Sequence, residues 1–129
     1  MLSSTKASDI KTEGIQVIAD PCYHLDHSEP EKGKYLFCYD ITIKNHSNKP
    51  VQLLSREWMI INSNGEEREI RGEGVIGMTP VINPDETFNY SSFCILDTPF
   101  GTMEGYYIMS IDGGDLEKIP IGRFYLSTN

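Results

Sequence analysis

The chain has 129 residues, and 11 Lys and Arg against 19 Asp and Glu residues give it a formal net charge of −8. This length suffices for one domain with a single hydrophobic core, and 39% hydrophobic and 23% charged residues are typical of a globular protein. A net negative surface repels phosphodiester backbones and anionic lipids, so we expect binding neither to nucleic acid nor to membranes.

The start of the chain is rich in Ser, Thr and Lys and contains no apolar stretch. We predict a flexible segment over residues 1–13, followed by one folded domain over residues 14–129. The sequence shows no signal-peptide pattern and no apolar run of about 18 residues, which predicts a cytoplasmic protein.

Alternation of apolar and polar residues with a period of two dominates the rest of the chain and predicts β-strands. It is clearest from Lys34 to Lys44, where the aromatic and aliphatic side chains share one face. Asn64 and Gly65 predict a two-residue hairpin turn between neighbouring strands. The predicted strands cover residues 14–23, 34–44, 51–63, 66–71, 87–96, 105–111 and 117–126.

These elements predict an all-β protein, because no segment has convincing helical spacing of apolar residues. About seven to eight strands separated by regular turn signals favour a two-sheet β-sandwich, with a closed barrel as the alternative. Cys22, Cys38 and Cys94 are widely spaced and lack a C-x-x-C motif, so we expect free thiols and no disulfide. The prediction is a disulfide-free fibronectin type III or immunoglobulin-like sandwich.

Four sequence blocks at characteristic spacing resemble the bacterial ApaG family. They are KYLFCYDITIKN at 34–45, PVQLLSREWMI at 50–60, RGEGVIGMTPVI at 71–82 and TPFGTMEGYY at 98–107. The resemblance implies a fibronectin type III-like sandwich, a module that also occurs as an interaction domain in some eukaryotic F-box proteins. It further implies a link to cobalt resistance and magnesium efflux, with no established enzymatic reaction.

A glycine-rich segment is the first candidate site. Arg71, Gly72, Gly74 and Gly77 fall within a G-x-G-x-x-G pattern, but predicted strands on both sides exclude a Rossmann-type nucleotide site. The loop could still expose backbone N–H groups to pyrophosphate or a nucleotide, with Arg71 as a charged clamp. Alternatively, the glycines serve only a tight turn.

A second candidate is a surface for a protein partner. Arg56, Trp58, Phe100 and Met103 belong to the residue types enriched at interfaces. The alternative is that these side chains close one end of the core.

The sequence offers little for metal binding or catalysis. His24, Asp26 and His27 include suitable ligand types, but adjacent residues point apart and a complete ligand set is missing. No nucleophile elbow or catalytic triad is recognisable. We therefore predict no catalytic residue, no metal site and no cofactor.

The preferred interpretation is a non-enzymatic binding module with an unidentified protein partner. Pairing of sheet edges could also form a homodimer. The alternative function is a sensor of pyrophosphate, a nucleotide or a divalent metal, acting through the glycine-rich loop.

Overall fold

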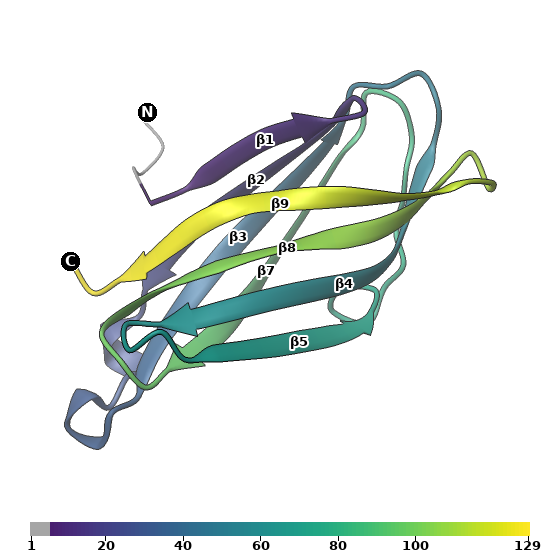
Figure 1. Cartoon of the computed structure of the whole chain (residues 1–129). Coiled ribbons are helices and arrows are strands. Elements are labelled where there is room, and N and C mark those ends of the chain that lie inside the picture. Colours follow the sequence, from purple (N-terminus) through teal and green to yellow (C-terminus); the bar gives the residue numbers. More distant parts are fainter. Residues whose placement is uncertain (1–5) are drawn as a thin grey trace.

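The computed structural model describes residues 6–129 and confirms the all-β sandwich (Figure 1). A four-stranded sheet has the order β1-β2-β3-β7, and a five-stranded sheet has the order β5-β4-β8-β9, with β6 paired to β4. Every strand pair is antiparallel. The strands are β1 (Ser8–Thr12), β2 (Ile15–Tyr23), β3 (Tyr35–Asn45), β4 (Val51–Asn62), β5 (Glu67–Glu73), β6 (Val81–Ile82), β7 (Thr87–Leu96), β8 (Phe100–Ile111) and β9 (Leu116–Ser127).

Within residues 6–129, helical structure is limited to two short 3₁₀ turns between β2 and β3. These turns are η1 (Leu25–His27) and η2 (Pro30–Lys32). Over residues 6–129, no helix is long and apolar enough to cross a membrane. The three cysteines are free, as predicted.

The sheet begins earlier in the chain than the sequence indicated. Ser8–Thr12, expected to be flexible, forms β1 and pairs in register with β2. Residues 1–5 of the predicted flexible segment lie outside the described part of the chain. The residues of β1 are mostly polar and lack the apolar alternation that predicts a strand. Pairing with β2 provides partners for the backbone N–H and C=O groups of this segment.

Two further boundaries differ from the prediction. Phe100–Glu104, expected in a loop, forms the first part of β8. The hairpin between β4 and β5 is longer than a two-residue turn, because Asn62 Oδ1 accepts hydrogen bonds from the backbone N–H groups of Asn64 and Glu66. This side-chain cap replaces the expected tight turn.

The core lies between the two sheets and contains inward-facing side chains from both. Tyr39, Trp58 and Phe124 pack with ring centroids 5.5 to 5.8 Å apart, which links the two layers. The largest fully buried side chains are Ile15, Phe37, Ile41, Ile43, Leu53, Ile82, Met103, Tyr107, Met109, Ile119, Phe124 and Leu126.

A β-bulge in β4 decides which of its residues face the core. Val51 and Leu53 point inward, and the register with β8 then shifts between Leu53 and Ser55. After the shift, the even-numbered residues face inward, so Trp58 is buried whereas Glu57 lies on the outer face. The same shift turns Arg56 toward the interior of the sandwich.

The sandwich has two lateral sides, where the edge strands of its two sheets lie, and these two sides differ. On one side β9 contacts both β1 and β2, and a Cβ at Gly122 would lie 3.1 Å from atoms of Ser8 and Ile10. On the other side, the edge strands are β5 and β7, each paired to only one neighbouring strand. Figure 1 shows these two strands at the same side of the two layers.

Candidate functional site

A groove opens between the edge strands β5 and β7, with a volume of about 460 Å³. Trp58 and Met103 form its buried floor, and Arg56, Arg68 and Ile70 line it from β4 and β5. Its complete lining is Tyr39, Arg56, Trp58, Ile60, Arg68, Ile70, Ser92, Phe93, Cys94, Ile95 and Met103. We call this the β5–β7 groove.

Arg56 enters the groove from β4 and lies against β5. Its Nη1 atom donates hydrogen bonds to the carbonyl oxygens of Glu73 (3.0 Å) and Gly74 (2.8 Å). A Cβ at Gly72 would lie only 2.7 Å from Nη1 and Nη2 of Arg56. The missing side chain of Gly72 therefore makes room for the guanidinium group.

Arg68 extends across the groove from β5 to β7, at the end of the groove away from Arg56. Its Nη2 atom donates to the carbonyl oxygen of Ile95 (3.2 Å) and lies 3.7 Å from Sγ of Cys94, so it connects β5 to β7. Burial raises the pKa of the Cys94 thiol, and the positive charge of Arg68 opposes this rise. The thiol is therefore held in its neutral form beside the arginine.

The charge of the groove differs in sign from that of the whole chain. Arg56 and Arg68 are its only charged lining residues, in a protein with a net charge of −8. The ion pairs found within residues 6–129 involve Lys32, Arg71 and Arg123, and neither groove arginine. Each guanidinium uses one nitrogen in the contacts above, so further N–H groups can bind a carboxylate or phosphate oxygen.

The two edge strands bordering the groove have contrasting sequences. β5 reads EREIRGE and carries five charged side chains, whereas β7 reads TFNYSSFCIL and carries none. Charged side chains on an edge strand oppose pairing with another strand. β5 therefore has this protection and β7 lacks it.

The backbone of β7 presents every second residue to the open edge. Asn45, the last residue of β3, donates its N–H to the carbonyl oxygen of Glu86, which directly precedes β7. Hydrogen-bonded and non-hydrogen-bonded pairs alternate along an antiparallel ladder, so the even-numbered residues of β7 form the hydrogen-bonded pairs with β3. The odd-numbered residues then direct N–H and C=O away from β3, consistent with the Ile95 carbonyl reaching Arg68. The backbone N–H and C=O groups of Asn89, Ser91 and Phe93 therefore point to the open edge of β7.

Exposed apolar side chains accompany this edge on the outer face of the sheet. Phe93 is 63% exposed and Ile95 is 45% exposed. Their cross-strand partners on β3 are Cys38 and Leu36, both partly buried. A strand added to β7 would meet apolar surface on its outer side and the β5–β7 groove on its inner side.

The glycine-rich segment forms a turn in which three backbone N–H groups have partners within the chain. Val75 N–H donates to Met78 O (2.8 Å), Met78 N–H donates to Val75 O (2.9 Å), and Gly74 N–H donates to Leu54 O (2.7 Å). Ile76 and Gly77 have φ angles of 43° and 78°, as in a type I′ hairpin turn. These contacts leave the predicted anion cradle with few N–H groups to offer.

The residues predicted for that site are only partly brought together: Arg71 and Gly72 line one shallow hollow, which does not include Gly74 and Gly77. Gly72 lies within β5 beneath Arg56, whereas Gly74 and Gly77 belong to the turn. Arg71 lies on the outer face of the sheet, because successive residues of β5 alternate between faces. Arg71 is therefore separated from the turn that contains Gly74 and Gly77, and the predicted ligand site stays a prediction.

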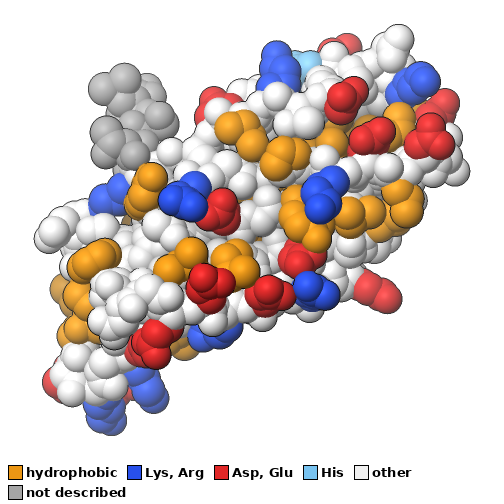
Figure 2. All heavy atoms as spheres, in the orientation of Figure 1, with side chains coloured by type: hydrophobic (Ala, Val, Ile, Leu, Met, Phe, Trp, Pro, Cys, Tyr) orange, Lys and Arg blue, Asp and Glu red, His pale blue; other side chains and the backbone are white. Residues whose placement is uncertain are grey.

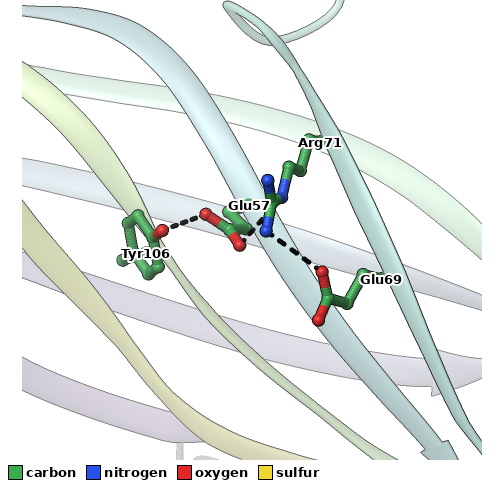
Figure 3. A network of polar contacts seen from close by, with 4 residues as sticks. All are labelled: Glu57, Glu69, Arg71 and Tyr106. Carbon is green, nitrogen blue, oxygen red and sulfur yellow. Dashed lines mark hydrogen bonds and ion pairs between the residues drawn. The ribbon is translucent and has the colours of Figure 1, made fainter.

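Arg71 instead belongs to a polar network across three strands. Its Nε lies 3.0 Å from Glu57 Oε1 and its Nη2 lies 3.2 Å from Glu69 Oε2, while the Tyr106 hydroxyl donates to Glu57. Figure 3 shows these four side chains in a row over β8, β4 and β5. The hydrogen bond to the Glu57 carboxylate raises the pKa of Tyr106. Figure 2 shows acidic and basic side chains interspersed on this face.

The residues predicted for a partner surface are divided. Arg56, Trp58 and Met103 all line the β5–β7 groove, but Trp58 and Met103 are only 2% and 1% exposed. Alternation directs both side chains inward, which agrees with the alternative that they belong to the core, and their role in partner binding stays a prediction. Phe100 is exposed at the start of β8 and does not line the groove.

The histidine-containing segment forms a local contact. His24 Nδ1 and His27 Nδ1 are 2.9 Å apart, and His24 is half-buried whereas His27 is exposed. Between Lys6 and Asn129, no group of three or more His, Cys, Asp or Glu side chains is arranged to hold a metal ion.

Sequence reasoning missed Arg68, Ser92 and Cys94, which belong to the groove. Ile70 could have indicated the inward face of β5, and hence Arg68, because residues i and i+2 of a strand share a face. Ile70 pairs with the buried Trp58, and Arg68 pairs with the buried Ile60. Both β5 residues therefore face the interior of the sandwich.

Comparisons with known proteins identify the family. The family model described as ApaG domain matches residues 25–111. Protein ApaG of Anaeromyxobacter sp. (strain K) is 44% identical over 115 residues, covering 89% of this chain and 90% of that protein. Protein ApaG of Shewanella halifaxensis is 43% identical over 126 residues, covering 98% and 93%.

A solved structure agrees with the sequence comparison. A crystal structure described as that of an ApaA protein from Bordetella pertussis superposes with a TM-score of 0.86 at 37% identity, covering 92% of this chain and 96% of that chain. The match therefore extends over nearly the whole sandwich. The chain belongs to the ApaG family.

Proposed function

We propose that this protein is a non-enzymatic binding module that takes an extended segment of a partner protein as an additional strand along β7. The carrying observation is the contrast between the two neighbouring edges, because β5 is densely charged and β7 has no charged residue. Main-chain hydrogen bonds to an open edge provide affinity in this type of recognition, and pockets for alternate side chains provide specificity.

The geometry on both sides of β7 supports a partner strand. Outward-facing Phe93 and Ile95 would lose solvent exposure beside the added strand, and inward-facing side chains of that strand would enter the β5–β7 groove. A second copy of this chain is less suited to this edge. Two molecules, each with a net charge of −8, repel one another.

The pyrophosphate or nucleotide sensor has less support. Its loop uses the N–H groups of Gly74, Val75 and Met78 internally, and Arg71 is paired with two carboxylates. The links of the family to cobalt resistance and magnesium efflux would, on this proposal, act through the partner protein.

Substitution at Ser91 tests the proposal. The Ser91 N–H points to the open edge, so Ser91→Pro removes a donor needed by a partner strand without breaking the ladder to β3. Ser91→Ala is the matched control, because both substitutions remove the side-chain hydrogen bond to Asp40. Ser92→Pro would break the ladder itself and should destabilise the fold.

The binding assay is a selection of nine-residue peptides displayed on phage. We expect the selected peptides to bind the wild type and Ser91→Ala equally and to bind Ser91→Pro at least about tenfold more weakly. Equal binding to a folded Ser91→Pro variant would exclude strand addition at β7.

A further inference from the structure

We propose that the segment bound along β7 is acidic, with two carboxylates four residues apart that reach Arg56 and Arg68 on either side of one apolar residue. This inference rests on the proposed function and adds the chemistry of the partner. It follows from the position of the two arginines, the apolar surface between them and the charge of the groove.

The spacing of the arginines defines the spacing of the carboxylates. The Arg56 guanidinium lies against Gly72, and Arg68 lies four residues earlier on the same strand. Four residues of strand span about 13 Å, and positions i and i+4 lie on one face. An extended segment parallel to these strands therefore presents side chains i and i+4 at the same separation.

On the β7 side, the Nη2 atom of Arg68 lies 3.7 Å from Sγ of Cys94 and donates to the carbonyl oxygen of Ile95. The pattern acidic-x-apolar-x-acidic reads identically in both directions, so it suits a parallel or an antiparallel partner strand.

The surface between the arginines is apolar. Ile70 is 37% exposed at the groove, and Trp58 lies beneath it as its cross-strand partner. Ser92, midway between Tyr90 and Cys94, is the only polar side chain lining the groove from β7. An apolar side chain at position i+2 would cover Ile70 without leaving a buried polar group unpaired.

Charge complementarity favours carboxylates over other partner side chains. The groove lining contains two arginines and no acidic residue, and both guanidinium groups retain N–H donors. The remaining surface is predominantly acidic and would repel the same segment elsewhere. The arginines therefore determine where an acidic segment binds.

The test uses four synthetic peptides with the intact protein. TTETVTETT carries the proposed pattern, TTQTVTQTT replaces both carboxylates, TTKTVTKTT reverses their charge, and TTETVETTT has the same composition with one glutamate moved to the other face of the strand. Fluorescence of Trp58, the single tryptophan, reports binding in the groove. Amide hydrogen exchange at Ser91 and Phe93 reports strand addition.

We expect TTETVTETT to protect both amides and to bind about tenfold or more tightly than TTQTVTQTT and TTETVETTT. Arg68→Gln should remove most of this preference, and Arg68→Glu should favour TTKTVTKTT. Arg123→Gln is the matched control, because Arg123 pairs with Glu104 away from the groove. It should leave all four affinities unchanged.

The outcomes separate the two proposals. Equal protection by the Glu and Gln peptides would overturn the acidic preference and retain strand addition. Failure of every peptide at millimolar concentration to protect Ser91 and Phe93 would overturn both, as would protection of these amides in the free protein by self-association. Saturable binding of inorganic phosphate in the groove, without peptide binding, would instead assign the arginines to a small anion.

Discussion

The guanidinium of Arg56 occupies the space where Gly72 lacks a side chain, and a Cβ there would come within 2.7 Å of both terminal nitrogens. This relationship holds the arginine along β5 and aims it into the β5–β7 groove. It also explains one glycine of the G-x-G-x-x-G pattern without any bound nucleotide.

Substitution of the neighbouring glycines should have different consequences. Gly72→Ala displaces only the end of a flexible side chain and should change the free energy of unfolding by no more than about 1 kcal/mol. Gly74→Ala places a Cβ 2.1 Å from the Met78 carbonyl oxygen at a φ of +59°, and should cost roughly 2 kcal/mol or more. Urea denaturation measures the free energy of unfolding of both variants. Similar losses in the two would contradict the different surroundings of Gly72 and Gly74.

The type I′ turn contains a residue poorly suited to its backbone. Ile76 is β-branched, has a φ of 43° and is 56% exposed. Ile76→Asn should raise the free energy of unfolding by about 1 kcal/mol, because Asn tolerates positive φ and little buried surface is lost. A thermal unfolding midpoint no higher than that of the wild type would show that the turn is not strained.

Two buried tyrosines should make the fold sensitive to alkaline pH. Their hydroxyl oxygens, in Tyr90 and Tyr107, are 2.5 Å apart, and burial is the main cause that raises both pKa values above the ordinary value of 10.0. Above pH 10 the unfolded chain releases phenolic protons that the folded protein retains, so stability falls as pH rises.

Variants of this pair test the explanation. Tyr107→Phe leaves the Tyr90 hydroxyl without its partner and should cost about 1–3 kcal/mol at pH 8. The double variant with Tyr90→Phe should lose less than the sum of the two single variants. Its stability, measured by urea denaturation at pH 8 and pH 11, should fall less with pH than that of the wild type. An equal fall would assign the alkaline sensitivity to other groups.

The network around Arg71 should contribute little to stability. The Arg71 side chain is 70% exposed, so solvent screens both of its ion pairs. Arg71→Ala should reduce the free energy of unfolding by less than about 1 kcal/mol and leave peptide binding unchanged. Glu57→Gln should lower the pKa of Tyr106 toward its ordinary value, which an ultraviolet titration can follow. A weaker peptide affinity in Arg71→Ala would place this residue in the binding site.

The sequence predicts most strands because their inward residues alternate regularly, as in β3. It does not predict β1, whose polar residues depend on pairing with β2, nor the two-residue β6. The groove is harder to predict, since the register shift after Leu53 changes which residues of β4 face inward. Arg56 and Trp58 could be selected by residue type, whereas their proximity to Arg68 depends on two edge strands far apart in the sequence.

Amide hydrogen exchange along β7 is the measurement that bears most closely on the addition of a partner strand. In the free protein we expect slow exchange at Tyr90, Ser92 and Cys94, whose N–H groups pair with β3, and fast exchange at Asn89, Ser91 and Phe93. A bound partner segment should slow exchange at this second set. Slow exchange at both sets before binding, or an unchanged second set in a saturated complex, would contradict strand addition at β7.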